Sequence, residues 1–393
     1  MKKLGESTWS KVDFDAALEC LLSDNHTMGA RVERFEAKFA EFVGSRFAVM
    51  LNSGSSANLV AATVIKDQDG LSMERRTVIV PALSWSTTYF PWIQNGYKLK
   101  FIDIDSTTFN MNLTDLISQI TPDVVGICIP HILGADAGIA EICKVALEKN
   151  VWVHEDTCES LGARALAGGG KLLGSFSRVG TYSFFRSHHI STMEGGMLVT
   201  DDIDLYHRAM AVRAHGWSRN IPSNSVLGNT STDEWMEKFT FFTQGYNLRP
   251  LEISAAVGVT QLDKIEEFLK FRRSNALYLQ HVMSDFPWLQ LQNQSSEGSW
   301  MAFGFVIKQD GVLRSKLMNH LSESEFETRP VVTGNFLRQP VINSLEKNVI
   351  AEGSFLGADE IHFKGFMLGN HGRDLKAEID SFTKCLRSFM PNS

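Results

Sequence analysis

The chain has 393 residues, of which 44% are hydrophobic and 21% are charged, so it can bury a large core. Its net charge of −7 argues against a surface that binds nucleic acid. The five cysteines are scattered without zinc or iron–sulfur spacing, so we expect free thiols and no metal. We find no apolar run of a signal peptide, and nothing near the roughly 20 apolar residues that span a bilayer. We therefore expect a soluble cytoplasmic protein.

Short apolar strands alternate with helical segments over the first half of the chain. An amphipathic helix is expected at 32–42 and another helix at 137–148. The expected strands lie at 47–51, 77–81, 100–105, 124–130, 151–156, 181–185 and 196–200. Continuous apolar strands between helices predict an α/β fold whose mostly parallel sheet is covered on both faces. Ligands of such sheets bind beyond the carboxyl ends of the strands.

The pattern changes near residues 244–250. Residues 252–281 have the spacing of one long helix, and the strand at 301–307 is followed by helices. We therefore expect a large domain at 1–250, which includes an N-terminal helical segment. The long linking helix and a small C-terminal α+β domain would form 251–393.

Polar or aromatic residues follow several of the expected strands. Residues 53–56, Ser-Gly-Ser-Ser, offer backbone N–H groups and hydroxyls to a phosphate, although the same residues can cap a helix. Trp85, among small hydroxyl residues, can stack on a planar ring or pack in the core. Asp156 ends a buried strand, where a carboxylate needs a partner such as a protonated pyridine nitrogen. A helix cap or a metal ligand are the alternatives for Asp156.

Two adjacent histidines, His188 and His189, lie between two expected strands. Neighbouring side chains on an extended segment point in opposite directions, so at most one of them faces a pocket. Either one alone would be read as a surface or core histidine.

Taken together and in order, these segments resemble the sugar aminotransferase family of fold-type I PLP enzymes over nearly the whole chain. The family's Glu-Asp-x-x-[Gln/Glu] matches 155–159, and Gly-Tyr-Asn-Leu-Arg-Pro at 245–250 matches a segment whose asparagine reaches the partner subunit's cofactor. The resemblance implies an aspartate-aminotransferase-like large domain with a seven-stranded sheet. It also implies a homodimer with shared active sites. The cofactor-binding residues implied are Gly54, Ser55, Ser56, Trp85, Asp156, Glu159, Ser183 and Asn247.

One departure from this family concerns the lysine that binds PLP covalently. Family aminotransferases carry Lys-Asn-[small]-x-x-x-Glu-Gly-Gly, and counting back from Gly195-Gly196 places His188 at the lysine position. The nearest lysines, Lys171 and Lys238, lie outside this segment. The substitution resembles the 3-dehydratases that make 3,6-dideoxy sugars. The segments at 187–189, 192–196, 213–217, 329–330 and 333–336 look like that subgroup.

This second resemblance implies a reaction. PMP would be the resting cofactor, glutamate its amino donor, and GDP-4-keto-6-deoxy-D-mannose the substrate, which would lose its C3 hydroxyl and release ammonia. The product would serve colitose and O-antigen synthesis. An imidazole has an unperturbed pKa of about 6.5, which suits His188 as the base at the cofactor's C4′ carbon and as the acid for the hydroxyl. Candidate substrate contacts are Ser187, His215, Arg219 and Arg329, although surface ion pairing is an equal explanation for the arginines.

Three alternatives remain open on the sequence. The chain could be a sugar aminotransferase that uses another lysine, a scaffold with an inactive aminotransferase fold, or a dehydratase for another nucleotide sugar. A sister 3-dehydratase for CDP-sugars needs an iron–sulfur cluster, and its cysteine cluster is absent here. The retained Trp85, Asp156, Ser183 and Asn247 speak against the scaffold.

Overall fold

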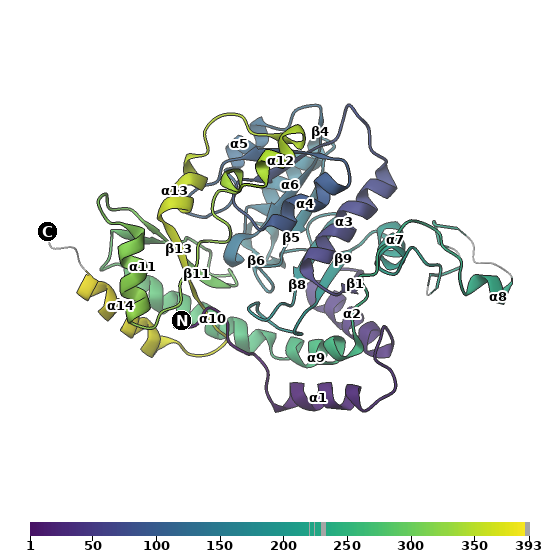
Figure 1. The fold of residues 1–393 in the computed structure, drawn as a ribbon, viewed down its shortest axis with the longest axis horizontal. Helices are drawn as coiled ribbons and strands as arrows, with labels where there is room; N and C mark the ends of the chain where they lie inside the picture. Colours follow the sequence, from purple (N-terminus) through teal and green to yellow (C-terminus); the bar gives the residue numbers. More distant parts are fainter. Residues whose placement is uncertain (220, 224, 229–232, 390–393) are drawn as a thin grey trace.

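A mixed sheet of eight strands forms the centre of the larger part of the molecule (Figure 1). The computed structural model describes residues 1–219, 221–223, 225–228 and 233–389. Across the sheet the strands are β1 (Phe47–Leu51), β9 (Gly196–Thr200), β8 (Val179–Ser183), β5 (Trp152–Asp156), β4 (Val124–Pro130), β2 (Thr77–Pro81), β3 (Lys98–Ile102) and β12 (Val349–Ile350). Neighbours from β8 to β12 are parallel, and β9 is antiparallel to both of its neighbours. The expected mostly parallel α/β fold is confirmed.

The strand β12 was not expected. Seven strands of this sheet come from the first 200 residues, as predicted, and the two-residue β12 adds an eighth when Val349 and Ile350 pair with Leu99 and Lys100 of β3. The C-terminal part of the chain thus completes the edge of the sheet.

Alternating side chains of the strands enter two separate cores. In β1, Val49 and Leu51 pack under helix α3, whereas Ala48 and Met50 pack against α2 and α9. This period of two places a helical layer on each face, as the continuous apolar strands predict. The helices of this part are α2 (Ala30–Val43), α3 (Gly54–Asp69), α4 (Ser86–Gln94), α5 (Leu113–Ser118), α6 (Ile139–Glu148) and α7 (Ile203–Arg213).

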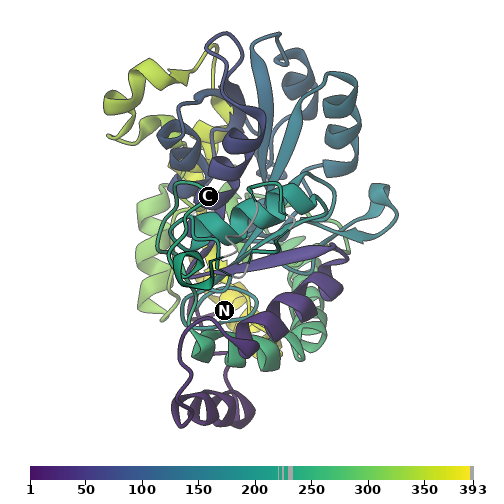
Figure 2. The same ribbon diagram turned by 90° about the vertical axis from the view of Figure 1, so that its right-hand side faces the viewer.

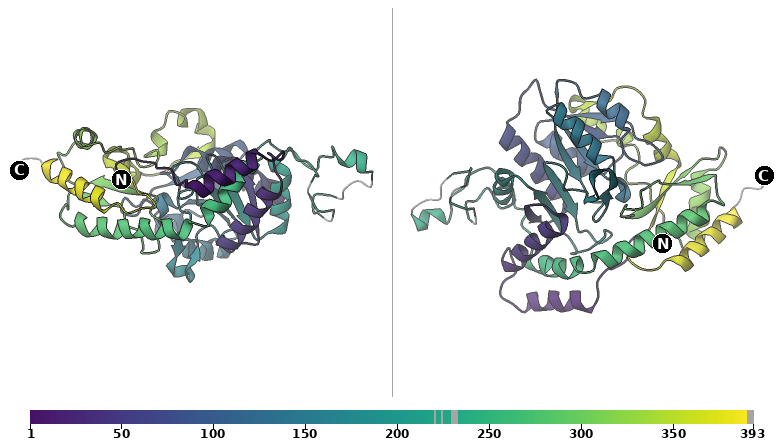
Figure 3. Two further views of the ribbon diagram at one scale, coloured as in Figure 1. Left: turned by 90° about the horizontal axis from the view of Figure 1, so that it is seen from below. Right: turned by 180° about the vertical axis from the view of Figure 1, so that it is seen from behind.

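The expected single helix at 252–281 is two helices. α9 (Glu252–Leu262) ends before Asp263, and α10 (Ile265–Met283) begins after Lys264. Asp263 and Lys264 separate the two helices, and the ammonium of Lys264 contacts Asp13 of α1 (Lys11–Leu21). α1 lies along α9, and the α9–α10 pair runs along the base of the molecule to its smaller part (Figure 3).

The smaller part is built on an antiparallel sheet of β10 (Leu289–Leu291), β11 (Ala302–Ile307) and β13 (Gly365–Gly369). Helices α11 (Arg314–Glu323), α13 (Leu356–Lys364) and α14 (Lys376–Phe389) surround it. The N-terminal Met1 packs in this core, and its amino group pairs with Glu378. The remaining short elements are β6 (Arg164–Ala165), β7 (Lys171–Leu172), α8 (Glu234–Glu237) and α12 (Ile342–Leu345).

The described residues within 214–249, which follow α7 and precede α9, are called the arm below. It projects from the body to the right in Figure 1 and toward the viewer in Figure 2, with α8 near its tip. Among the described residues, no helix is both long and apolar enough to cross a membrane.

Candidate active site

A cavity of about 360 Å³ opens at the carboxyl ends of the parallel strands. Its walls come from the turns after β1, β2, β4, β5 and β8 and from three segments of the smaller part. Nine of the predicted site residues line it: Gly54, Ser55, Trp85, Asp156, Glu159, Ser183, Ser187, His188 and Arg329. No lysine lines this cavity in the described part of the chain. No group of three metal-ligating side chains occurs among the described residues either.

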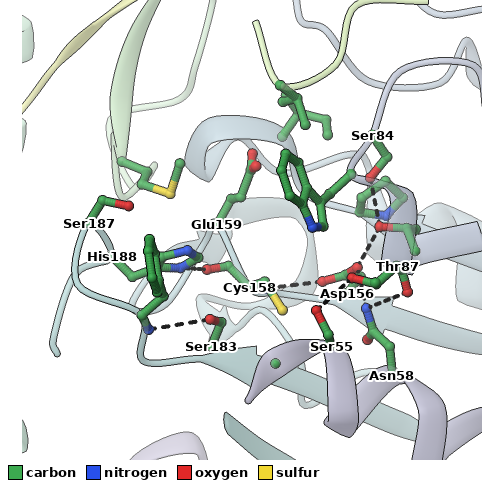
Figure 4. A pocket seen from close by; sticks show the side chains of 18 of the residues that line it. Ser55, Asn58, Ser84, Thr87, Asp156, Cys158, Glu159, Ser183, Ser187 and His188 are labelled. Carbon is green, nitrogen blue, oxygen red and sulfur yellow. Dashed lines mark hydrogen bonds between the residues drawn. The ribbon is translucent and has the colours of Figure 1, made fainter. Parts of the chain in front are cut away.

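The carboxylate of Asp156 is held by three donors. Its Oδ2 accepts from Asn58 Nδ2 at 2.9 Å and from Thr88 Oγ1 at 2.8 Å, and its Oδ1 accepts from the Cys158 backbone N–H at 3.2 Å (Figure 4). Donors on both oxygens favour the ionised form, which is the form that a protonated ring nitrogen requires. Thr88 comes from α4 and Asn58 from α3, so both helices fix this side chain.

The glycine of the Ser-Gly-Ser-Ser turn is required by close packing. A Cβ on Gly54 would lie 2.5 Å from Ser183 Cβ and 2.9 Å from Cys158 Sγ, closer than a side chain can approach. Ser53 caps α3 by accepting from the Ser56 N–H at 3.1 Å, so the helix begins at Gly54. The N–H groups of the first turn of α3 therefore face a space lined by hydroxyls, as a phosphate needs.

Trp85 stands at the mouth of the cavity as the N-terminal flanking residue of α4. Its side chain is 55% exposed although it is a large aromatic, so the core-packing alternative does not describe it. Ser55 Oγ lies 2.9 Å from Thr87 Oγ1, which ties the first turns of α3 and α4 together beneath it. An open aromatic face, an ionised carboxylate and a phosphate cradle around one cavity fit the three parts of PLP.

His188 and His189 have different surroundings, although the segment is a turn closed by the His188 N–H on the Phe185 carbonyl and not the extended chain that we expected. His188 lines the cavity and its Nδ1 lies 2.5 Å from the Cys158 carbonyl oxygen, whereas His189 is buried with Nε2 3.2 Å from the Ser299 carbonyl oxygen. A carbonyl only accepts, so Nδ1 of His188 carries the proton and Nε2 is bare. Burial lowers the pKa of His188 to about 4, which keeps this ring neutral near pH 7.

Two further carboxylates end or follow β5. Glu159 lines the cavity, accepts from the Leu133 N–H at 2.9 Å, and has its pKa raised to about 7 by burial. Glu155 points to the other face of the sheet, where its Oε1 lies 3.3 Å from His131 Nε2. Burial alone would raise the pKa of Glu155, but His131 and backbone N–H groups outweigh it, so the pKa is lowered.

Four predicted residues lie outside this cavity. Ser56 Oγ contacts Asn52 Oδ1 at 2.6 Å, away from the lining. His215, Arg219 and Asn247 belong to the arm by their position in the sequence. His215 has a φ of +66°, the Arg219 guanidinium lies 5.2 Å from the Trp217 ring, and Asn247 Oδ1 accepts from Arg249 at 3.0 Å.

Sequence reasoning missed several residues of the cavity. Asn58 and Thr88 hold Asp156, yet each is an ordinary helical residue whose partner is 98 or 68 positions away. Met301, Val332 and Met367 form a wall from the smaller part, and nothing local in their sequence marks them. Both polar residues lay close to features that had been singled out, Asn58 five residues after Ser53 and Thr88 three residues after Trp85, but nothing local showed that they hold Asp156.

Comparison with known proteins now gives the family. The model of the DegT/DnrJ/EryC1/StrS aminotransferase family matches residues 8–385. A GDP-4-keto-6-deoxy-D-mannose 3-dehydratase of Yersinia pseudotuberculosis is 40% identical over 387 residues, which are 98% of this chain and 98% of that protein. The solved structure of an E. coli enzyme of that name with bound hydrated PLP has a TM-score of 0.93 and 40% identity, with 98% of each chain covered. A structure of GDP-4-keto-6-deoxymannose-3-dehydratase holding a trapped PLP–glutamate adduct also has a TM-score of 0.93, with 39% identity over 98% of this chain and 99% of that one.

These likenesses agree with the structure over its full length. The eight-stranded sheet, the cavity and the smaller part all lie within the matched residues, and the expected resemblance to 3-dehydratases is confirmed. This chain therefore belongs to the DegT/DnrJ/EryC1/StrS aminotransferase family.

Proposed function

We propose that this chain is a PLP- and PMP-dependent 3-dehydratase that removes the C3 hydroxyl of GDP-4-keto-6-deoxy-D-mannose. Glutamate is the amino donor, and ammonia is released. The observation that carries the proposal is His188, which lines the cavity at the position of the family's lysine with its Nε2 free. The 40% identical relatives bearing this enzyme's name, and the PLP and glutamate held in their structures, support the same choice.

The cofactor is held without a covalent bond in this proposal. Gly54, Ser55 and Ser183 bind its phosphate, Trp85 covers its ring, and Asp156 binds its ring nitrogen. Glu159 lies on the same wall, close enough to the carboxylate of Asp156 that the two charges interact. When bound, PMP supplies an amino group that reacts with the C4 ketone of the sugar and a ring that accepts electrons.

His188 moves the protons. Its Nε2 is a neutral base near pH 7, because burial keeps the pKa of the ring at about 4 and Nδ1 is engaged by the Cys158 carbonyl. The protonated ring is then an acid that can protonate the departing C3 hydroxyl. Ser187 and Arg329 line the same cavity and are our candidates for the sugar and its phosphates.

We further propose a homodimer in which the arm completes the partner's cavity. The arm carries His215, Arg219 and Asn247, none of which reaches the cavity of its own chain. Its described residues expose large apolar side chains, including Trp235 at 75% and Phe239 at 73%. Several exposed aromatic side chains close together in the sequence are typical of surfaces that bind another protein.

The remaining readings are less well supported. Neither Lys171 nor Lys238 lines the cavity, which weighs against an aminotransferase that uses one of them. An inactive scaffold would have no use for the three donors on Asp156. All five cysteines are free thiols, which supports a cytoplasmic location.

One experiment separates these readings. The protein is incubated with PLP, glutamate and GDP-4-keto-6-deoxymannose, and ammonia and the sugar product are measured. We expect ammonia and a 3-deoxy-4-keto sugar in equal amounts. A 4-amino sugar without ammonia would contradict the dehydratase. No turnover and no spectral change of PLP on addition of glutamate would favour the scaffold. A parallel incubation replaces the GDP-sugar by a CDP-linked 4-keto-6-deoxy sugar, and turnover of that sugar alone would correct the nucleotide.

A further inference from the structure

A continuous series of buried hydrogen bonds leads away from Asp156 beneath the cavity. Asn58 Nδ2 lies 2.9 Å from Asp156 Oδ2, and Thr181 Oγ1 lies 2.6 Å from Asn58 Oδ1. His154 Nε2 lies 3.1 Å from Thr181 Oγ1, and Cys128 Sγ lies 3.1 Å from His154 Nδ1. We call these five residues the relay.

The relay is buried below the cavity floor, which Asp156 and Asn58 line, and it is built on the sheet itself. Cys128, His154 and Thr181 are fully buried, and Asn58 and Asp156 are 3% and 6% exposed. Cys128 pairs with His154 across β4 and β5, and Asp156 pairs with Thr181 across β5 and β8. Because side chains alternate along a strand, all of them lie on the face that α3 covers, where Asn58 closes the series.

The direction of the first hydrogen bond is decided by the neighbours of Asn58. Its amide nitrogen faces Asp156 Oδ2 and, at 3.2 Å, the Thr87 carbonyl oxygen, and both of these atoms only accept. A flipped amide would place its oxygen against both acceptors. The NH2 group therefore points to Asp156, and the amide oxygen points to Thr181.

The other directions follow. Thr181 Oγ1 must donate to Asn58 Oδ1, because an amide oxygen cannot donate; the Glu155 carbonyl, its alternative acceptor, is farther away at 3.3 Å. The hydroxyl has one hydrogen, so His154 Nε2 must be the donor to Thr181. Nδ1 of His154 is then bare and accepts from the Cys128 thiol.

This assignment requires a neutral His154, and the surroundings provide for it. The imidazole is fully buried beside the Trp92 ring, whose centroid is 5.5 Å away. Burial lowers the pKa of His154 to about 4, and Cys128 keeps its proton because burial raises the pKa of its thiol. Every donor in the relay thus points toward the Asp156 carboxylate.

We propose that His154 is a positioning residue for the cofactor, which acts through Thr181 and Asn58 to hold Asp156 as an ionised, fixed partner of the pyridine nitrogen. Aligned donors in a buried network strengthen one another, so the relay holds the carboxylate in one orientation. The proposal rests on the cofactor assignment above, and it extends the cofactor site by three residues that do not line the cavity: Cys128, His154 and Thr181.

The test uses PMP labelled with ¹⁵N in its ring, bound to the whole protein, and follows the ring-nitrogen chemical shift against pH. The first variant is Thr181→Val, which keeps the shape of the side chain and removes the hydroxyl. The matched control is Thr200→Val, which removes another buried hydroxyl from the same sheet, where it donates to the Arg178 carbonyl at 2.8 Å. Thermal melts compare the stability of the two variants.

We expect the ring nitrogen in Thr181→Val to titrate at least about one pH unit below its wild-type midpoint, with PMP bound about tenfold more weakly. Thr200→Val should match the wild type in both respects. If Thr181→Val does not fold, His154→Phe should give the same shift, and His154→Gln, whose amide can still donate to Thr181, should restore the wild-type midpoint.

Unchanged midpoints in Thr181→Val or His154→Phe would overturn the relay, as would an equal shift in His154→Gln or Thr200→Val, because packing alone would then explain it. The outcome is separable from the proposed function. A wild-type protein that binds PMP but releases no ammonia contradicts the dehydratase and leaves the relay measurable, whereas one that binds no PMP refutes the relay.

Discussion

The Nδ1 atom of His188 lies 2.5 Å from the carbonyl oxygen of Cys158, two residues beyond the Asp156 carboxylate. The contact fixes the tautomer of the ring, so the nitrogen left free is Nε2. The turn after β5 thus carries the Asp156 carboxylate at one side of the cavity and orients the His188 ring at the other side (Figure 4).

Replacing His188 by asparagine should separate cofactor binding from turnover. His188→Asn removes Nε2, the proposed base, but none of the contacts to Asp156 or to the phosphate cradle. PMP affinity should therefore change less than threefold, while kcat falls by about 10²- to 10⁴-fold. Ammonia release and an absorbance titration with PMP measure the two quantities. His189→Gln is the control, because that side chain is buried against Ser299, and it should remain active. A His188→Asn enzyme with near-normal turnover would remove His188 as the base.

The acid limb of the pH profile of kcat/KM should have its midpoint at the pKa of His188. The pKa is lowered to about 4, so the imidazole is protonated below that value and cannot accept a proton, and it is neutral above it. Activity should therefore rise through pH 4 and be level by about pH 6, provided that the protein is still folded, which circular dichroism would check. An acid limb centred near pH 6.5 would mean that the ring is not desolvated as the structure indicates.

Glu159 should destabilise the folded chain at alkaline pH. Its pKa is about 7 in the folded state and 4.5 without burial, so the unfolded chain releases this proton first. The stability contributed by the protonated form is complete below pH 4.5, declines as the pH rises, and is lost above pH 7. Glu159→Gln cannot ionise and therefore keeps this stability at high pH. At pH 8 the free energy of unfolding of the apo variant should exceed that of the apo wild type by about 1 to 3 kcal/mol. Equal stability of the two proteins at pH 8 would show that Glu159 is already ionised at its ordinary pKa.

Much of this site could be predicted because its residues follow strands. Trp85, Asp156 and Ser183 come directly after or at the end of apolar strands, and the parallel arrangement brings such positions to one edge. The role of His188 depended on a count from Gly195-Gly196 and on family resemblance, since two adjacent histidines carry little information by themselves.

What the sequence did not reveal depends on contacts between distant segments. Asn58 and His154 belong to the relay only because β5 lies between β4 and β8 and because α3 covers that face. The break between α9 and α10 falls at Lys264, whose ammonium pairs with Asp13 about 250 residues earlier, and helical periodicity continues through it. The β12 strand has two residues, too few to form a recognisable pattern.

The proposed role of the arm requires a second chain, because the arm completes the cavity of the partner. Arg219 and His215 belong to the arm and are absent from the lining of the cavity, whereas Arg329, Ser187 and His188 line it. If the arm completes a second cavity, then a defect in the arm and a defect at His188 affect different sites of the same dimer. If the arm instead served the cavity of its own chain, each variant chain would have a defective site whatever its partner.

Mixing two inactive variants tests this directly. His188→Asn and the double variant His215→Ala, Arg219→Ala should each be nearly inactive alone, whereas refolding them together should restore up to about a quarter of wild-type ammonia release, because half the dimers are mixed and each has one intact site. The control replaces the arm variant by Arg46→Ala, a surface change on the body: this variant should be active alone. A mixture as inactive as its parents, or an arm variant that is active alone, would show that the arm does not contribute to the partner's site. Recovery beyond a quarter would require the chains to pair preferentially as mixed dimers, which size and mass measurements on differently tagged chains would detect.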